Sequence, residues 1–246
     1  MQIAPVTSRL QRIRHELRLR EVTVTQAVRI SPGFIAVTFA DPSLRDFPSA
    51  SFSDHVKLIL PDVGGGPVRR DYTPRSFQLA RGELTIEFAL HESGPASDWA
   101  RQARPGQKIT VGGPKGSVLV PLDYDWHLLA GDATALPAMH RRLEELPRSA
   151  RGVVVLQVAD PADQRAFPCG PGIAVVWVTT GAAFLAALRG LDLPEGNGFA
   201  WCAGETGLMM EARAILLGTH RLAREQVRVS GYWKRGLVAV HEKFED

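Results

Sequence analysis

Residues 128–138 carry the run Leu128-Leu129-Ala130-Gly131-Asp132-Ala133-Thr134-Ala135-Leu136-Pro137-Ala138. Apolar residues lead into a glycine and an aspartate, and helix-forming residues follow. We expect a buried strand, a tight turn and a helix, because Asp132 can cap a helix start and Pro137 suits the first helical turn. In a parallel sheet such a turn lies at the carboxyl end of a strand, where nucleotides bind. The run lacks the GxGxxG spacing, so by itself it does not assign a nucleotide.

The same alternation of strand and helix continues toward the C-terminus. Apolar, strand-like runs occupy 128–130, 153–156, 173–178 and 199–202. Helical periodicity separates them, with one apolar stripe over 136–146 and another over 208–216. Strands that alternate with helices predict an open parallel α/β sheet of the nucleotide-binding type.

The N-terminal half has a different texture. Short β-rich segments occupy 22–25, 34–39, 55–60 and 83–90, and Pro/Gly turn signals occur at 31–33, 64–67, 81–82 and 104–106. Such spacing predicts an antiparallel β-barrel or sandwich. We expect a two-domain chain whose parts meet near Pro121 to Asp125, with an N-terminal β-barrel domain over 1–122 and a C-terminal α/β domain over 123–246.

Composition excludes several classes of protein. The chain has 246 residues, 45% hydrophobic and 22% charged, which predicts a folded core. Its two cysteines, Cys169 and Cys202, have no metal-ligand or disulfide-framework spacing. No apolar run approaches the roughly 18 residues of a membrane span, and arginines interrupt the first twenty residues where a secretion signal would be apolar. We therefore expect a soluble cytoplasmic protein.

The charge is mild, +3, and dispersed, so nucleic-acid binding is not expected. The exception is 9–20, where Leu10, Ile13 and Leu17 are spaced for one helical face with arginines between them. We expect a terminal helix that packs this stripe on its own domain. A helix at a membrane surface or on nucleic acid is the alternative.

Two N-terminal segments contain side chains suited to a flavin. If 70–75 is one strand, Arg70 and Tyr72 share a face, and with Thr73 they offer a cation, an aromatic ring and a hydroxyl. In 91–100, Gly94 permits close backbone approach and Pro95 begins a helix. The alternatives are an ordinary strand with a surface Arg/Asp pair, a solvated histidine at position 91 and a core tryptophan at position 99.

Two C-terminal segments suit a ligand, and the first of them, 201–206, can form the opposite side of a nicotinamide cleft. Residues 201–206 again predict strand, turn and helix, and 231–236 place two aromatic and two basic side chains at the end of the last strand. An anionic or aromatic ligand would suit them. A buried Tyr–Trp pair with solvated bases is the alternative.

Read in order, these segments resemble the siderophore-interacting protein family, flavin-dependent ferric-siderophore reductases of the ferredoxin-NADP reductase superfamily. The carrying segments are 70–75, 91–100, Gly113-Pro114-Lys115-Gly116-Ser117, 131–138, 203–205 and 232–236. The resemblance spans roughly residues 20 to 240 and implies a flavin-binding barrel followed by an NAD(P)H-binding domain. It implies FAD as cofactor, NADPH or NADH as electron donor, and a ferric siderophore as the substrate from which Fe(II) is released.

The resemblance also implies individual site residues. The cofactor-binding positions are Arg70, Tyr72, Thr73, Arg75, His91, Gly94, Pro95, Ala96, Ser97, Gly131, Asp132, Thr134, Pro137, Gly204 and Glu205. The positions expected to hold the iron chelate are Lys57, Lys234 and Arg235. Neither a catalytic side chain nor a metal ligand is implied, because the flavin performs the redox chemistry. In agreement, the chain has no GxSxG, HExxH or Walker motif.

Two departures from the family pattern leave alternatives open. Ala133 stands where the family commonly has an acidic residue, and the chain ends soon after Gly236, so we expect a more exposed flavin. A flavin reductase of the same fold with another acceptor and a non-catalytic flavin- or chelate-binding module are both retained. Reduced ferredoxin is an alternative donor, and we expect a monomer.

Overall fold

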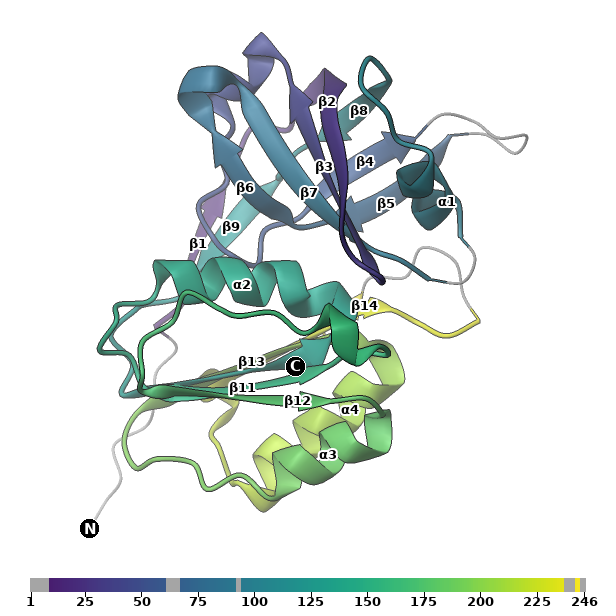
Figure 1. Ribbon diagram of the computed structural model, residues 1–246. Helices are drawn as coiled ribbons and strands as arrows, with labels where there is room; N and C mark the ends of the chain where they lie inside the picture. The colour runs from purple at the N-terminus through teal and green to yellow at the C-terminus, as the bar shows by residue number, and fades with distance from the viewer. Residues whose placement is uncertain (1–8, 61–66, 92–93, 237–241, 244–246) are drawn as a thin grey trace. The chain divides into compact units, whose positions relative to one another are not determined.

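The computed structural model describes residues 9–60, 67–91, 94–236 and 242–243, so the glycine run at 64–66 lies outside the described residues. The chain forms two compact units (Figure 1). The barrel unit comprises 11–119 together with 140–142, and the α/β unit comprises 1–10, 120–139 and 143–246. Each unit is described by itself.

A curved antiparallel sheet forms the barrel unit. Its strand order is β5-β4-β8-β2-β3-β7-β6. The strands are β2 (Leu19–Ser31), β3 (Phe34–Ala40), β4 (Val56–Leu60), β5 (Val68–Tyr72), β6 (Pro74–Gln78), β7 (Glu83–Ala89) and β8 (Lys108–Gly112). A separate ribbon pairs β1 (Gln11–Arg14) with β9 (Gly116–Leu119), and the helical elements are η1 (Pro42–Asp46), η2 (Leu79–Arg81) and α1 (Pro95–Arg101). The predicted antiparallel half is confirmed.

Alternation along these strands builds the core of the barrel unit. Val22, Val37 and Phe39 are fully buried, and their neighbours along each strand are more exposed. Trp99, on α1, packs its ring 6.2 Å from Phe39 and 5.6 Å from Phe88, measured between ring centroids. Trp99 therefore packs on the core, which confirms the interpretation of this residue as a core tryptophan.

The α/β unit contains a six-stranded sheet with the order β12-β11-β10-β13-β14-β15. The strands are β10 (Trp126–Asp132), β11 (Gly152–Gln157), β12 (Ile173–Val178), β13 (Gly198–Glu205), β14 (Val227–Trp233) and β15 (Glu242–Lys243). Neighbouring strands from β12 to β14 are parallel, and β15 is antiparallel to β14. The predicted parallel sheet is confirmed.

Helices cover the faces of this sheet. They are α2 (Leu136–Glu145), α3 (Gly181–Arg189) and α4 (Thr206–Ala214), with short turns η3 (Ala133–Ala135), η4 (Pro161–Asp163), η6 (Arg224–Gln226) and the π-helical η5 (Ile215–Thr219). Figure 1 shows α3 and α4 side by side on one face of the sheet, and α2 on the other. On the α3–α4 face, Phe184, Leu188 and Met209 are fully buried against the apolar strands.

The expected helix over 9–20 is wrong. Residues 11–14 form β1, and β2 begins at Leu19. Ile13, Leu17 and Leu19 are 39%, 53% and 67% exposed, so the helical spacing does not mark a buried stripe. The strand forms because β9 supplies a pairing partner, and Gly116 permits the close approach: a Cβ there would lie 2.5 Å from the carbonyl oxygen of Ile13.

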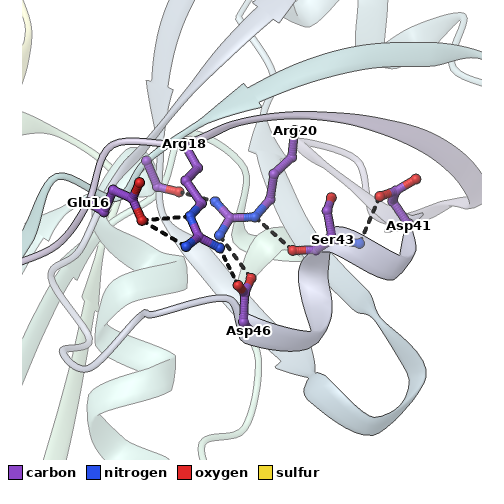
Figure 2. Close-up of polar contacts among 7 residues, drawn as sticks. Glu16, Arg18, Arg20, Asp41, Ser43 and Asp46 are labelled. Carbon is purple, nitrogen blue, oxygen red and sulfur yellow. Dashed lines mark hydrogen bonds and ion pairs between the residues drawn. The ribbon is translucent and has the colours of Figure 1, made fainter.

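The arginines that follow β1 hold a local polar network. Arg20 is buried, and its guanidinium donates to the carbonyl of Ser43 at 2.8 Å and to the carboxylate of Asp46 at 3.2 Å. Figure 2 shows the Asp46 carboxylate between Arg20 and Arg18, and Arg18 also pairs with Glu16. The hydrogen bond from Arg20 and the charge of Arg18 hold the pKa of Asp46 below its usual range. Much of the basic segment is therefore internally paired.

The single strand expected over 70–75 is also wrong. β5 ends at Tyr72 and β6 begins at Pro74, so these strands lie at opposite ends of the sheet order. Proline has no backbone N–H, and its ring restricts the preceding residue, which favours a break at Thr73. The predicted alternation of faces holds for Arg70 and Tyr72 but does not extend to Arg75.

Within the described residues, no helix is long and apolar enough to cross a membrane. The same residues contain no cluster of potential metal-binding side chains. Both cysteines are free thiols; Cys202 lies fully buried in β13, and burial raises its pKa to about 12.

Candidate functional site

In the barrel unit, Tyr72 and Arg70 form the centre of the predicted flavin site. The Tyr72 ring packs on Phe88 with centroids 4.5 Å apart, and burial raises the pKa of its hydroxyl, which therefore stays protonated. Arg70 stands two residues earlier on the same face of β5 and donates to the carbonyl of Arg69 at 2.8 Å. Within the described ranges it forms no ion pair. The strand thus offers a fixed aromatic ring beside an uncompensated cation.

Arg75 has a different environment, although it belongs to the same predicted set. Its guanidinium lies 3.3 Å from the carboxylate of Glu87 on the adjacent strand β7, and both side chains are nearly buried. This ion pair offsets its charge. Thr73, between β5 and β6, is also buried. Of the predicted flavin contacts on this segment, Arg70 retains the most available charge.

The second predicted flavin segment lies at the start of α1. Gly94 precedes the helix with φ +149°, and among the described residues beyond its chain neighbours no atom lies within 4 Å of the place a Cβ would take. The glycine is thus required by its backbone conformation rather than by crowding. Pro95 is the first helical residue, as predicted, and Ala96 follows it into the core.

Ser97 and His91 are joined within this segment. The backbone N–H of His91 donates to Ser97 Oγ at 3.1 Å, and the guanidinium of Arg101 donates to the carbonyl of His91. Ser97 is buried, whereas His91 is exposed. The serine hydroxyl therefore ties the strand end to the helix, a structural use that the sequence pattern did not reveal.

Lys57, a predicted chelate contact, lies on β4 and forms an ion pair with Asp71 at 2.6 Å. Val56, its neighbour, pairs across the strands with Tyr72 and is fully buried. Because successive side chains alternate between faces, Lys57 projects from the opposite face of the β4–β5 pair to Tyr72. A ligand that touches both would have to pass around an end or the free edge of this strand pair.

In the α/β unit, the Asp132 carboxylate is the centre of a hydrogen-bond cluster at the carboxyl edge of the sheet. Oδ1 accepts from the Thr134 N–H at 2.9 Å and from the Thr134 hydroxyl at 2.5 Å. Oδ2 accepts from the Glu205 N–H at 2.8 Å and from Trp233 Nε1 at 2.8 Å. Asp132 caps η3, which leads into α2, so the expected capping role is confirmed.

Glu205 holds the neighbouring turn. Its carboxylate accepts from the Leu208 N–H at 2.8 Å, which caps α4, and from the Arg235 N–H at 3.3 Å. The Thr206 hydroxyl donates to the carbonyl of Trp233 at 3.1 Å. The predicted residues Asp132, Thr134 and Glu205 are thus brought together.

Two predicted glycines serve packing at this edge. A Cβ on Gly131 would lie 2.1 Å from the carbonyl oxygen of Ala203 on the adjacent strand. Gly204 has φ +155°, and a Cβ there would lie 2.7 Å from Asp132 Oδ2. Both positions therefore exclude side chains so that the ends of β10 and β13 can approach each other.

The accessible part of the nucleotide turn is small. Ala133 and Thr134 are half-buried, whereas Pro137 is buried in the first turn of α2. Lys234 is half-buried and Arg235 is exposed, both directly after β14. These half-buried and exposed groups can contact an anionic ligand, whereas the Asp132 carboxylate is buried.

Trp233 and Thr206 are residues of this site that were not assigned from sequence. Their signal was present, because both lie in segments recognised as turns at strand ends. The pairing of the Trp233 indole with Asp132 joins positions 101 residues apart. No local spacing predicts such a contact.

Two family models match the chain. The model described as the siderophore-interacting FAD-binding domain matches residues 23–68 and 64–118. The model described as siderophore-interacting protein matches residues 124–236. Together they span most of the strands of both units.

Among curated relatives, an NADPH-dependent ferric-chelate reductase of Escherichia coli K12 is 35% identical over 245 residues, covering 91% of this chain and 96% of the relative. A ferric vibriobactin reductase of Vibrio cholerae is 30% identical over 233 residues, covering 84% of this chain and 86% of the relative. Among solved structures, a siderophore utilization protein from T. fusca has a TM-score of 0.88 at 31% identity, covering 94% of this chain and 98% of that one.

Proposed function

Because the chain belongs to the siderophore-interacting protein family, we propose that it is an NADPH-dependent reductase of ferric chelates, ferric siderophores included. The similarity to the E. coli ferric-chelate reductase carries this proposal, since it extends over nearly the whole of both chains. The reaction consumes one NADPH and two Fe(III) chelates, and yields NADP⁺, a proton and two Fe(II). Reduction weakens the chelate, because Fe(II) is a poorer partner for hard oxygen donors.

The barrel residues fit an FAD cofactor. Arg70 supplies an uncompensated cation for the diphosphate, and the Phe88-supported ring of Tyr72 supplies an apolar surface. Gly94 leaves open space beside the start of α1. When bound, FAD accepts two electrons from a nicotinamide and passes them singly to iron. We assign the cofactor contacts, in a flavin-binding part over 1–122, to Arg70, Tyr72, Thr73, Arg75, His91, Gly94, Pro95, Ala96 and Ser97.

The α/β unit supplies the nucleotide site, within the part over 123–246. The half-buried residues Ala133 and Thr134 and the turn at Gly204–Glu205 offer backbone groups at the carboxyl edge of a parallel sheet, the usual place for a nucleotide. Asp132 repels a diphosphate less than a bare carboxylate would, because four hydrogen bonds from neutral donors spread its charge. Its part in binding is to hold the turn.

Lys234 and Arg235 are the proposed contacts of the chelate in this unit. Catecholate and hydroxamate siderophores are commonly anionic, so a pair of cations attracts them. Lys57 is the proposed contact in the barrel unit, and its charge is shared with Asp71. We further propose that the protein acts in the cytoplasm as a monomer.

An anaerobic absorption titration tests the proposal. The FAD-loaded protein should lose its yellow colour on addition of NADPH, regain it on addition of a ferric siderophore, and release Fe(II) to a ferrous-selective dye. A protein reduced by NADPH but reoxidised by no ferric chelate would identify another acceptor. A protein that NADPH does not reduce would exclude this donor, and titration with NADH and with reduced ferredoxin would then identify the alternative. Failure to bind FAD at all would overturn the assignment of the barrel.

A further inference from the structure

Hydrogen bonds from the protein itself occupy the acceptor sites of the Asp132 carboxylate. Only 7% of the residue is exposed, and each oxygen accepts two hydrogen bonds. An ionised carboxylate has about four acceptor sites. No acceptor site remains for a ligand, so any effect of Asp132 on binding must act through the segments it holds.

Those segments belong to three different strand ends. Thr134 lies in η3 directly after β10, Glu205 is the last residue of β13, and Trp233 is the last residue of β14. The last of them is held again by the Thr206 hydroxyl on the Trp233 carbonyl and by Glu205 on the Arg235 N–H. The backbone that carries Lys234 and Arg235 is thereby fixed relative to the turn over 131–137.

We propose that Asp132 is a positioning residue for two ligand-binding segments at once. It holds the nucleotide turn over 131–137 and the backbone that carries the cationic pair Lys234 and Arg235. A ligand binds more weakly to a segment that must first be ordered, because the ordering entropy is then lost on binding. One buried carboxylate therefore sets the affinity for both ligands. The identity of the ligands rests on the proposed function, whereas the anchoring is a property of the hydrogen bonds.

The carboxylate form is required for this role. In Asp132→Asn, an amide NH₂ replaces one oxygen, so two of the facing donors lose their acceptor, and the effect of this substitution should be at least as large as that of losing one hydrogen bond. Trp233→Phe is a gentler change, because it keeps an aromatic ring and removes only the indole N–H. Trp177→Phe is the matched control. Trp177 lies on β12, its ring stacks on that of Phe167 with centroids 5.6 Å apart, and it takes no part in the cluster.

The test measures direct binding to the FAD-loaded protein by calorimetry. The probes are NADP⁺ and the gallium(III) complex of a tris-catecholate siderophore, which cannot be reduced. Asp132→Asn and Trp233→Phe should each raise both dissociation constants about tenfold, the factor that the loss of one hydrogen bond usually produces. Lys234→Ala should weaken the gallium chelate alone. Trp177→Phe should change neither, and FAD content should be equal in all variants.

The proposal is overturned if the cluster variants weaken one ligand only, or neither. If Asp132→Asn fails to fold, Trp233→Phe decides the outcome. If the wild-type protein binds neither probe, the proposed function fails, and amide hydrogen exchange still decides the anchoring. Trp233→Phe should then speed exchange at Glu205 and Arg235 relative to Trp177→Phe, and equal rates would overturn the inference.

Discussion

Arg70 and Arg69 are neighbours on β5 that project from opposite faces of the strand. Arg70 shares the Tyr72 face, so Arg70→Ala should raise the dissociation constant of FAD about tenfold or more, as the loss of a charge-assisted hydrogen bond does. Arg69→Ala removes an equal charge from the other face and should leave the dissociation constant of FAD nearly unchanged. Fluorescence titration of the apoprotein with FAD measures both, and equal weakening would indicate only a general effect of net charge.

A second prediction at the scale of a single residue concerns the stability effect of a side chain at Gly131. A Cβ there would lie 2.1 Å from a backbone oxygen of the neighbouring strand, which cannot yield as a flexible side chain can. We expect Gly131→Ala to lower the free energy of unfolding by about 1–3 kcal/mol.

Gly218→Ala is the matched control for this substitution. Apart from its own helix backbone and chain neighbours, no described atom lies within 4 Å of its added Cβ. Alanine at this helical position should leave the free energy of unfolding unchanged or raise it by up to about 1 kcal/mol. Urea unfolding of both variants gives the comparison. A loss no larger at position 131 than at position 218 would show that the strands can separate to accept the methyl group.

At the scale of an element, the polar network beside η1 connects pH with stability. Asp46 has a folded-state pKa below its ordinary 3.8, chiefly because Arg20 donates to it. A depressed carboxylate pKa stabilises the fold above 3.8, and this contribution disappears as pH falls through the lower folded-state pKa. The difference in free energy of unfolding between wild type and Asp46→Asn should therefore be positive at pH 6 and smaller near pH 3.

Denaturant unfolding at both pH values measures this difference. Because the carboxylate is exposed, 1 M NaCl should reduce the difference at pH 6 as well. A difference independent of pH would contradict the prediction, because it would mean that the pKa of Asp46 is the same in the folded and unfolded states.

Elements also show what local sequence can and cannot predict. The apolar runs of β10, β11, β12 and β13 were predictable, because a buried parallel strand is apolar along its whole length. The spacing of Leu10, Ile13 and Leu17 predicted a helix, but a distant partner, β9, determined a strand. The break at Thr73 separates strands that pair with different neighbours, and it depends on the whole sheet rather than on six residues.

For the whole molecule, the two units should respond to different ligands. FAD should slow amide hydrogen exchange in β5 and α1, and NADP⁺ should slow it in the turns at 131–137 and 204–206. The reason is that a bound ligand stabilises the segments it contacts by mass action. Exchange measured by mass spectrometry with each ligand in turn tests this. Protection of the barrel segments by NADP⁺ would contradict the assignment.

The family resemblance predicted which residues belong to the candidate site but not the structural role of each. Gly131, Gly204 and Asp132 occur at positions expected for a nucleotide, yet their immediate contacts are internal: Gly131 lies against Ala203, Gly204 lies against Asp132, and Asp132 accepts from Thr134, Glu205 and Trp233. Such contacts require the folded sheet edge, where strands distant in sequence end together. Recognition of a motif therefore located the site before its internal architecture could be inferred.

The buried thiol of Cys202 has a practical consequence for a protein that handles electrons. A thiol with a pKa of about 12 is almost never a thiolate at neutral pH, and the thiolate is the form that oxidants and alkylating reagents attack. Cys169 is only half-buried. A maleimide dye should therefore label the native chain at position 169 alone, which gives a single-site spectroscopic handle without cysteine engineering.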